Sequence, residues 1–110
     1  MNIGSLRHRI ILQDLVIIPN TLGEGEETWV DRGTIWAEIR PLRGNEFWMA
    51  QQVNSKITHK ITTRYYQNID SVNRLKFGDR LFEIISVINP DERCSELNFL
   101  CEEVTSSDRR

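Results

Sequence analysis

Histidine and cysteine, the side chains that most often bind zinc or form nucleophile–base pairs, are scarce in this sequence. Its 110 residues include two histidines and two cysteines. There is no Cys-x-x-Cys pair, phosphate-binding glycine loop or nucleophile elbow. A zinc site needs Cys or His ligands at close spacing, whereas His8, His59, Cys94 and Cys101 are scattered along the chain. Both histidines lie on apolar faces of alternating segments, which favours buried structural roles. We therefore expect no enzymatic activity, no cofactor and no metal.

Long apolar runs and export signals are also absent. Purely apolar runs reach only four residues, as at Leu15–Ile18, against the ~20 needed to span a bilayer. No apolar stretch follows the first basic residues, so we expect neither a signal peptide nor a membrane partner. If Cys94 and Cys101 lie on one strand, they are ~23 Å apart on opposite faces. A disulfide cannot bridge that distance, so reduced thiols in a cytoplasmic setting are expected.

Charge of one sign does not dominate. The chain has 14 Lys and Arg against 16 Asp and Glu, a net charge of -2, which excludes a strongly basic nucleic-acid binder. The charges are unevenly placed, because residues 20–32 and 81–110 are acidic while residues 56–80 are basic. A mixed, solvated surface explains this ordinarily. The alternative is head-to-tail association, in which the basic face of one subunit meets the acidic face of its neighbour.

Alternation of apolar and polar residues with a period of two is the main pattern in the chain, and it predicts strands. The expected strands are 7–14 (with an extension to 18 left open), 28–30 as a short return, 34–42, 55–64, 74–77, 80–88 (apolar on both faces) and 93–104. These five to seven short strands predict a mainly β protein, a small antiparallel barrel or sandwich. We expect one domain over residues 1–104, with long loops at 15–33 and 43–55, and a flexible tail at 105–110.

One short helix is predicted at residues 44–54, with Asn45 as its N-cap and an apolar stripe formed by Met49, Ala50 and Val53. The adjacent Phe47, Trp48 and Met49 are informative, because three consecutive helical residues spread over ~200°. They cannot all enter one core, so an aromatic side chain is left near the surface. Such exposure favours a contact with a subunit or partner. The alternative is a segment folded onto its own domain.

A basic strand face is a further candidate site. Lys56, Lys60 and Arg64 alternate along the predicted strand 55–64, and Tyr65 and Tyr66 follow. This arrangement is typical of small barrels that bind nucleic acid. A solvated strand face beside a packed tyrosine explains it equally.

Several short motifs, taken together in order, resemble the head–tail joining proteins of tailed bacteriophages, also called head-closure or stopper proteins. The motifs are Leu6-Arg7-His8-Arg9-Ile10, Thr28-Trp29, Ile35-Trp36-Ala37-Glu38-Ile39, Gly44-x-Glu46, Arg64-Tyr65, Phe82-Glu83-Ile84 and Leu100-Cys101-Glu102-Glu103. The resemblance covers residues 5 to 104. The chain departs from the family pattern at Asn20, where members often carry aspartate.

The resemblance implies a structural protein at the head–tail interface of the virion, made in the cytoplasm of the bacterial host. Subunits would form a ring of twelve, with the free state left open, between the portal or adaptor above and a tail-completion or tail-tube protein below. Packaged DNA would pass through the ring without sequence-specific binding. The implied gate or interface residues are Gly44, Glu46, Phe47, Trp48, Gln51 and Gln52. The implied neighbour or adaptor contacts are Glu24, Glu26, Glu27 and Trp29.

Two other functions are kept as alternatives. One is a minor tail or tail-completion protein with a similar barrel. The other is a small nucleic-acid-binding barrel that uses Lys56, Lys60 and Arg64, for which we expect salt-sensitive DNA binding.

Overall fold

The computed structural model describes residues 6–67, 69 and 73–105. Its elements are β1 (His8–Pro19), β2 (Gly25–Pro41), α1 (Gly44–Val53), β3 (His59–Arg64), β4 (Arg74–Phe77), β5 (Arg80–Ile88), the 3₁₀ turn η2 (Pro90–Glu92) and β6 (Glu96–Thr105). Of the tail expected at 105–110, residues 106–110 lie outside the described part. Among the described residues, no helix is both long and apolar enough to cross a membrane.

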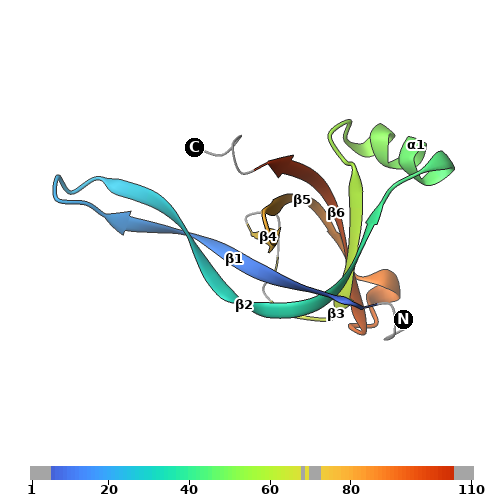
Figure 1. Cartoon of the computed structure of the whole chain (residues 1–110), viewed down its shortest axis with the longest axis horizontal. Coiled ribbons are helices and arrows are strands. Elements are labelled where there is room, and N and C mark those ends of the chain that lie inside the picture. The colour runs from blue at the N-terminus through green and yellow to red at the C-terminus, as the bar shows by residue number, and fades with distance from the viewer. Residues whose placement is uncertain (1–5, 68, 70–72, 106–110) are drawn as a thin grey trace.

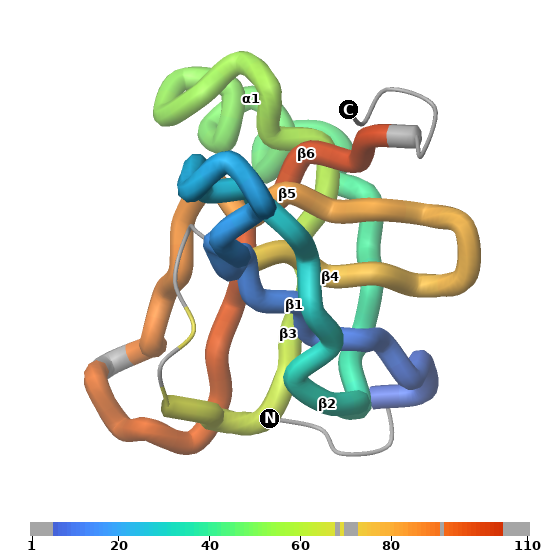
Figure 2. The backbone as a smooth tube through the Cα atoms, turned by 90° about the vertical axis from the view of Figure 1, so that its left-hand side faces the viewer, coloured from blue at the N-terminus to red at the C-terminus, as the bar shows by residue number. Residues whose placement is uncertain are grey.

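The six strands form a closed barrel in the order β1-β2-β3-β6-β5-β4, and β4 pairs back onto β1 (Figures 1 and 2). All neighbouring strands are antiparallel. Closure gives the backbone groups of the barrel strands partners on both sides, which an open sheet lacks at its edges. The predicted mainly β fold with one short helix is therefore confirmed, and it is a barrel rather than a sandwich.

Alternation builds the core, because every second residue of a barrel strand points inward. Phe82 and Phe99 are fully buried at its centre. The other buried members are Ile10, Leu12, Ile35, Ala37, Ile61, Ile69, Leu75, Ile84, Leu97 and Cys101. A smaller cluster of Leu42, Ala50 and Ile57 lies beneath α1.

The prediction of a long loop at 15–33 is wrong. In the structure β1 and β2 continue as a paired hairpin to Pro19 and Gly25. We call residues 13–32 the arm. Figure 1 shows it extending well beyond the barrel. The β-branched and aromatic residues at 16–18 and 28–30 favour strand, but they do not alternate regularly with polar residues. The hairpin turn is closed by the Asn20 side chain, which accepts hydrogen bonds from the backbone N–H groups of Leu22 and Glu24 at 2.9 and 3.0 Å.

Two strand boundaries also differ from the prediction. β3 begins at His59 rather than at residue 55, so Lys56 lies in the preceding turn. β6 begins at Glu96, so Cys94 lies before the strand, with a φ of 56°. The two cysteines are free as expected, Cys94 exposed and Cys101 buried. Burial strongly raises the pKa of the Cys101 thiol.

The sequence predicts apolar residues on both faces of the strand at 80–88. Burial on both faces is seen only in the first half of β5. Leu81, Phe82 and Ile84 are buried, and Ile85 packs against the cluster beneath α1. The register shifts between Ile84 and Ser86, and Ile88 is exposed. A β-bulge changes which face each later side chain occupies, so Ile88 reaches the surface while Val87 still packs partly against the barrel core.

Candidate interaction surfaces

Helix α1 is held firmly on the end of the barrel. The Arg40 guanidinium donates two hydrogen bonds to the Glu46 carboxylate, at 2.8 and 3.0 Å, and this contact lowers the pKa of Glu46. Gln51 donates from Nε2 to the carbonyl of Ile57 at 2.7 Å. Gly44 adopts a φ of 60° at the first turn, a conformation that glycine reaches without strain. Glu46, Gln51 and Gly44 therefore position the helix.

The predicted helix is confirmed, but its cap and its packed face are not as expected. Arg43 is the N-cap and makes no side-chain capping bond, and Asn45 lies inside the first turn. Of the predicted apolar stripe only Ala50 is buried, while Met49 and Val53 are 69% and 70% exposed. Phe47 packs against the cluster beneath α1 instead. The packed residues are set by the angle at which Gly44 starts the helix, which the sequence pattern does not show.

The outer side of α1 is an exposed apolar surface. Trp48 is 68% exposed, with Phe47 edge-on to its ring at 6.4 Å between centroids, and Gln52 is also exposed. We call Trp48, Met49 and Val53 the helix patch. Large apolar side chains left exposed together mark contacts with other molecules more often than chance.

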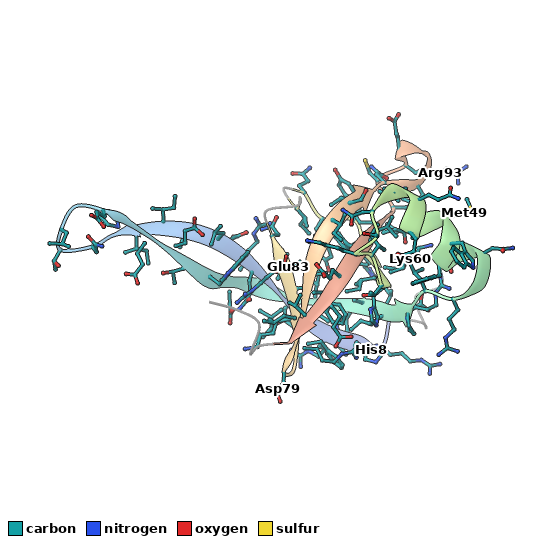
Figure 3. The ribbon with its side chains drawn as sticks, turned by 90° about the horizontal axis from the view of Figure 1, so that it is seen from above. His8, Met49, Lys60, Asp79, Glu83 and Arg93 are labelled. Atoms are coloured by element: carbon teal, nitrogen blue, oxygen red, sulfur yellow. The ribbon has the colours of Figure 1, made fainter. Side chains whose placement is uncertain are left out.

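A groove of about 420 Å³ adjoins the helix patch, between α1 and the barrel. Its walls are mainly apolar, and its charged residues are Glu46 and Lys60, whose side chains lie 3.8 Å apart. Figure 3 shows Met49 and Lys60 on the same end of the molecule. The apolar lining residues are Leu42, Met49, Ala50, Val53, Ile88, Pro90 and Leu100.

The predicted basic face is formed only in part. Lys56 lies in a turn, and Lys60 is paired with Glu46. Only Lys60 and Arg64 share a side of β3, and Arg64 stands opposite Glu96 on β6. Tyr65 packs partly against the core rather than forming a stacking platform with Tyr66. Two of the three predicted basic residues therefore remain together on β3, and Lys56 lies apart from them in the turn.

The arm is a second exposed surface. Glu24, Glu26 and Glu27 are exposed near its tip, as expected for contact residues. Trp29 lies instead near the barrel, partly buried, with the Arg74 guanidinium over its ring at 4.2 Å. Apolar side chains are exposed along the arm as well, including Ile17 at 69% and Leu22 at 81%. Ile17 and Ile18 point to opposite faces of the ribbon, so both faces carry apolar area.

A polar junction fixes the base of the arm to β4. Gln13 is buried at the register shift of β1. Its Nε2 donates to Asp31 at 2.8 Å, and its Oε1 accepts from Arg74 at 2.6 Å. Asp14 accepts from Arg32 at 2.6 and 2.9 Å and also from Asn73, and the hydrogen bond from Arg32 is the main cause of its lowered pKa. Sequence reasoning missed this junction. Its one signal is Gln13 directly after the inward-facing Leu12, where alternation breaks.

The two histidines are half-buried beside aromatic rings. His59 lies edge-on to Phe82, 3.5 Å from Glu103, which Arg80 holds by two hydrogen bonds. Burial lowers the pKa of His59, although Glu103 opposes this shift. His8 lies edge-on to Phe77, and its buried Nδ1 has no hydrogen-bond partner in the described part of the chain. Among the described residues, no three His, Cys, Asp or Glu side chains are grouped to hold a metal.

A small closed barrel that projects a ribbon and an exposed helix is typical of a structural protein that acts by contact with other subunits. Comparison with known proteins supports this class. A model of the phage head completion protein family matches residues 1–104. The chain belongs to the phage head completion protein family, a head–tail joining family, as the resemblance implied.

Individual relatives agree with this assignment. Head completion protein gp16 of Bacillus phage SPP1 is 34% identical over 65 residues, 57% of this chain and 60% of that protein. The match therefore spans about 60% of the length of this relative. Protein SF1141 from Shigella flexneri 2a has a solution structure with a TM-score of 0.76 and 32% identity, covering 96% of this chain and 99% of that one. A chain in the virion of a native gene transfer agent particle shares the fold at a TM-score of 0.62 and 23% identity, with coverage of 92% and 97%.

Proposed function

We propose that this protein joins the phage head to the tail as a ring and closes the DNA channel after packaging. The ring, of twelve subunits, lies between the portal or adaptor above and the tail-completion or tail-tube protein below. The helix patch carries this proposal, because its exposed apolar side chains stand on a helix that is fixed to a rigid barrel. A fixed, exposed hydrophobic patch is suited to a permanent contact with other proteins.

Exposure and packing support a finer assignment of residues to this proposed role. Trp48, Met49 and Gln52 are exposed and serve as contact or gate residues, whereas Gly44, Glu46, Phe47 and Gln51 seat the helix. Glu24, Glu26 and Glu27 on the arm contact a neighbouring subunit or the adaptor. The low net charge of -2 also supports a channel role, because a strongly basic wall would hold phosphates and impede the sliding of DNA.

Electron microscopy of a lysate from phage that lack this gene tests the proposal. Separate tails beside tailless heads that have lost DNA are the expected result. Intact, DNA-filled, tailed particles would contradict it. Closed, full heads beside tails with abnormal ends would contradict the channel-closing role and favour a tail-completion protein.

Complementation with a single variant locates the contact. We expect Trp48→Ala to leave the fold intact, because surface substitutions change stability by roughly 0.5 kcal/mol or less, and to lower the yield of joined particles. Trp36→Ala is the matched control, since Trp36 is also an exposed tryptophan, 50% accessible, but lies on β2. Equal particle yields from the two variants would rule out the helix patch as the contact.

A further inference from the structure

We propose that the arm of one copy docks on the helix patch and its groove in the next copy, so that subunits join head to tail. The proposal rests on the ring of the proposed function and names the surfaces that form its subunit interface. Its occupant is a second copy of this chain.

The arm needs a partner for its apolar side chains. A two-stranded hairpin alone is marginally stable in water, and its two outer backbone edges are open to pairing. Leu15, Ile17, Ile18, Leu22 and Val30 are all exposed on this ribbon. Because both faces carry apolar residues, folding the ribbon onto its own barrel would cover only one of them.

The helix patch and its groove present apolar surface that suits the apolar side chains of the arm. The groove is mainly apolar and opens beside the exposed Met49 and Val53. Its volume of about 420 Å³ lies in the range that accommodates a few apolar side chains. Leu22 and Ile18, at the far end of the arm, are the side chains best placed to enter it.

Charge favours the same pairing. Residues 15–31 contain four acidic residues and no Lys or Arg, whereas residues 40–60 contain four basic residues and one acidic residue, Glu46. Glu46 is already paired with Arg40 and Lys60. Glu24, Glu26 and Glu27 form no ion pair with another described residue. Arg43 and Lys56 are exposed on the α1 side, where they complement this acidic tip.

Placement makes the contact intermolecular. The arm tip and α1 lie at opposite ends of the long axis (Figure 1). The arm of one chain therefore cannot reach the helix patch of the same chain. A contact between two different surfaces is heterologous, and repetition of it produces a closed ring or an open filament. Repetition of the contact between the arm and the helix patch is therefore sufficient to build the ring, and no second type of subunit interface is needed.

Crosslinking with paired cysteines tests this interface. In a Cys94→Ser background, the variant Ile18→Cys/Met49→Cys is expressed during infection by phage that lack the gene, and the lysate is treated with a short bis-maleimide. We expect a ladder of dimers, trimers and larger species on a denaturing gel, at least about tenfold stronger than the control. The control pair is Ile18→Cys/Asp79→Cys, because Asp79 is exposed in the β4–β5 turn, away from Met49 (Figure 3).

A second cysteine pair and charge-reversal variants test the same interface independently. Leu22→Cys/Val53→Cys samples the same contact in another register, and Glu26→Lys/Glu27→Lys should weaken either ladder about tenfold. Adding Arg43→Glu and Lys56→Glu to that charge variant should restore the ladder. A ladder from neither pair above the control would overturn the proposal. Phage titre, measured on the same cultures, reports head–tail joining separately, so joined particles without a ladder overturn the interface alone.

Discussion

At the scale of single residues, stability depends on a few large buried side chains. Phe99 is fully buried, and it stands beside Ile61 across the β3–β6 pair. Removing a phenyl ring from such a site loses its transfer free energy and leaves a cavity.

We expect Phe99→Ala to lower the free energy of unfolding by about 3–5 kcal/mol. Urea denaturation followed by tryptophan fluorescence measures the change, with Trp36 and Trp48 left in place as reporters. Phe47→Ala is the comparison, because Phe47 is only partly buried at the smaller cluster and should cost less. Equal losses from the two variants would show that the barrel interior is not the main core.

His59 gives the protein a pH-dependent term in its stability. Burial lowers the pKa of His59 in the folded state below its ordinary value of 6.5. As the pH falls below 6.5 the unfolded chain therefore binds a proton at this site more readily than the folded chain, and the folded state loses stability. Glu103, whose pKa Arg80 holds below 4.5, adds a loss of the same sign only at lower pH.

We therefore expect wild type to lose stability between pH 7.5 and pH 5.5, and His59→Gln to lose less over that interval. Chemical denaturation at the two pH values measures both. An identical pH dependence in the variant would show that His59 does not carry this term.

At the scale of elements, the arm is a projecting ribbon whose orientation depends on its polar junction. Gln13 bridges Asp31 on β2 and Arg74 on β4, and Asn73 donates to the Gln13 carbonyl at 3.3 Å. The arm is thereby tied to the strand that closes the barrel.

We expect Gln13→Ala to cost about 1–3 kcal/mol, because buried partners are left unsatisfied, and to increase hydrogen exchange across residues 14–31 while the barrel stays protected. Amide exchange followed by mass spectrometry measures this. Thr34→Ala, an exposed change on β2 within the barrel, is the control. Exchange that rises equally over the whole chain would mean that the junction supports the barrel rather than the arm.

Periodicity in the sequence was sufficient for the elements that have one buried face. It placed the strands at 74–77 and 80–88 correctly, and the helix predicted at 44–54 ends one residue earlier, at Val53. It failed for the arm, because Ile17 and Ile18 lie on a ribbon with no buried face and show no alternation. It also failed for the seat of α1, because Phe47 and Ala50 pack against Leu42 and Ile57, a contact that depends on the angle of the helix.

At the scale of the whole molecule, the chain separates a stable scaffold from its contact surfaces. Its extents are 49 × 27 × 26 Å, and Figure 1 shows that the long dimension comes from the arm. The arm tip and the helix patch therefore lie at the two ends of the molecule. In the proposed ring, each subunit contacts one neighbour with the arm and the other with the helix patch.

The candidate site was predictable from sequence only in part. The sequence predicts that one aromatic side chain of the Phe47–Met49 segment stays near the surface, and in the structure it is Trp48. The groove was not foreseen, because Ile88 reaches it only through the register shift in β5. A bulge of this kind changes which face a side chain occupies and leaves no mark in composition.

Cryo-electron microscopy of the neck of purified particles tests the central claim most directly. The account predicts a ring of this barrel around the DNA channel between portal and tail, with each arm lying against the α1 of the adjacent subunit. A neck resolved at the level of side chains with no copy of this barrel between head and tail would contradict it.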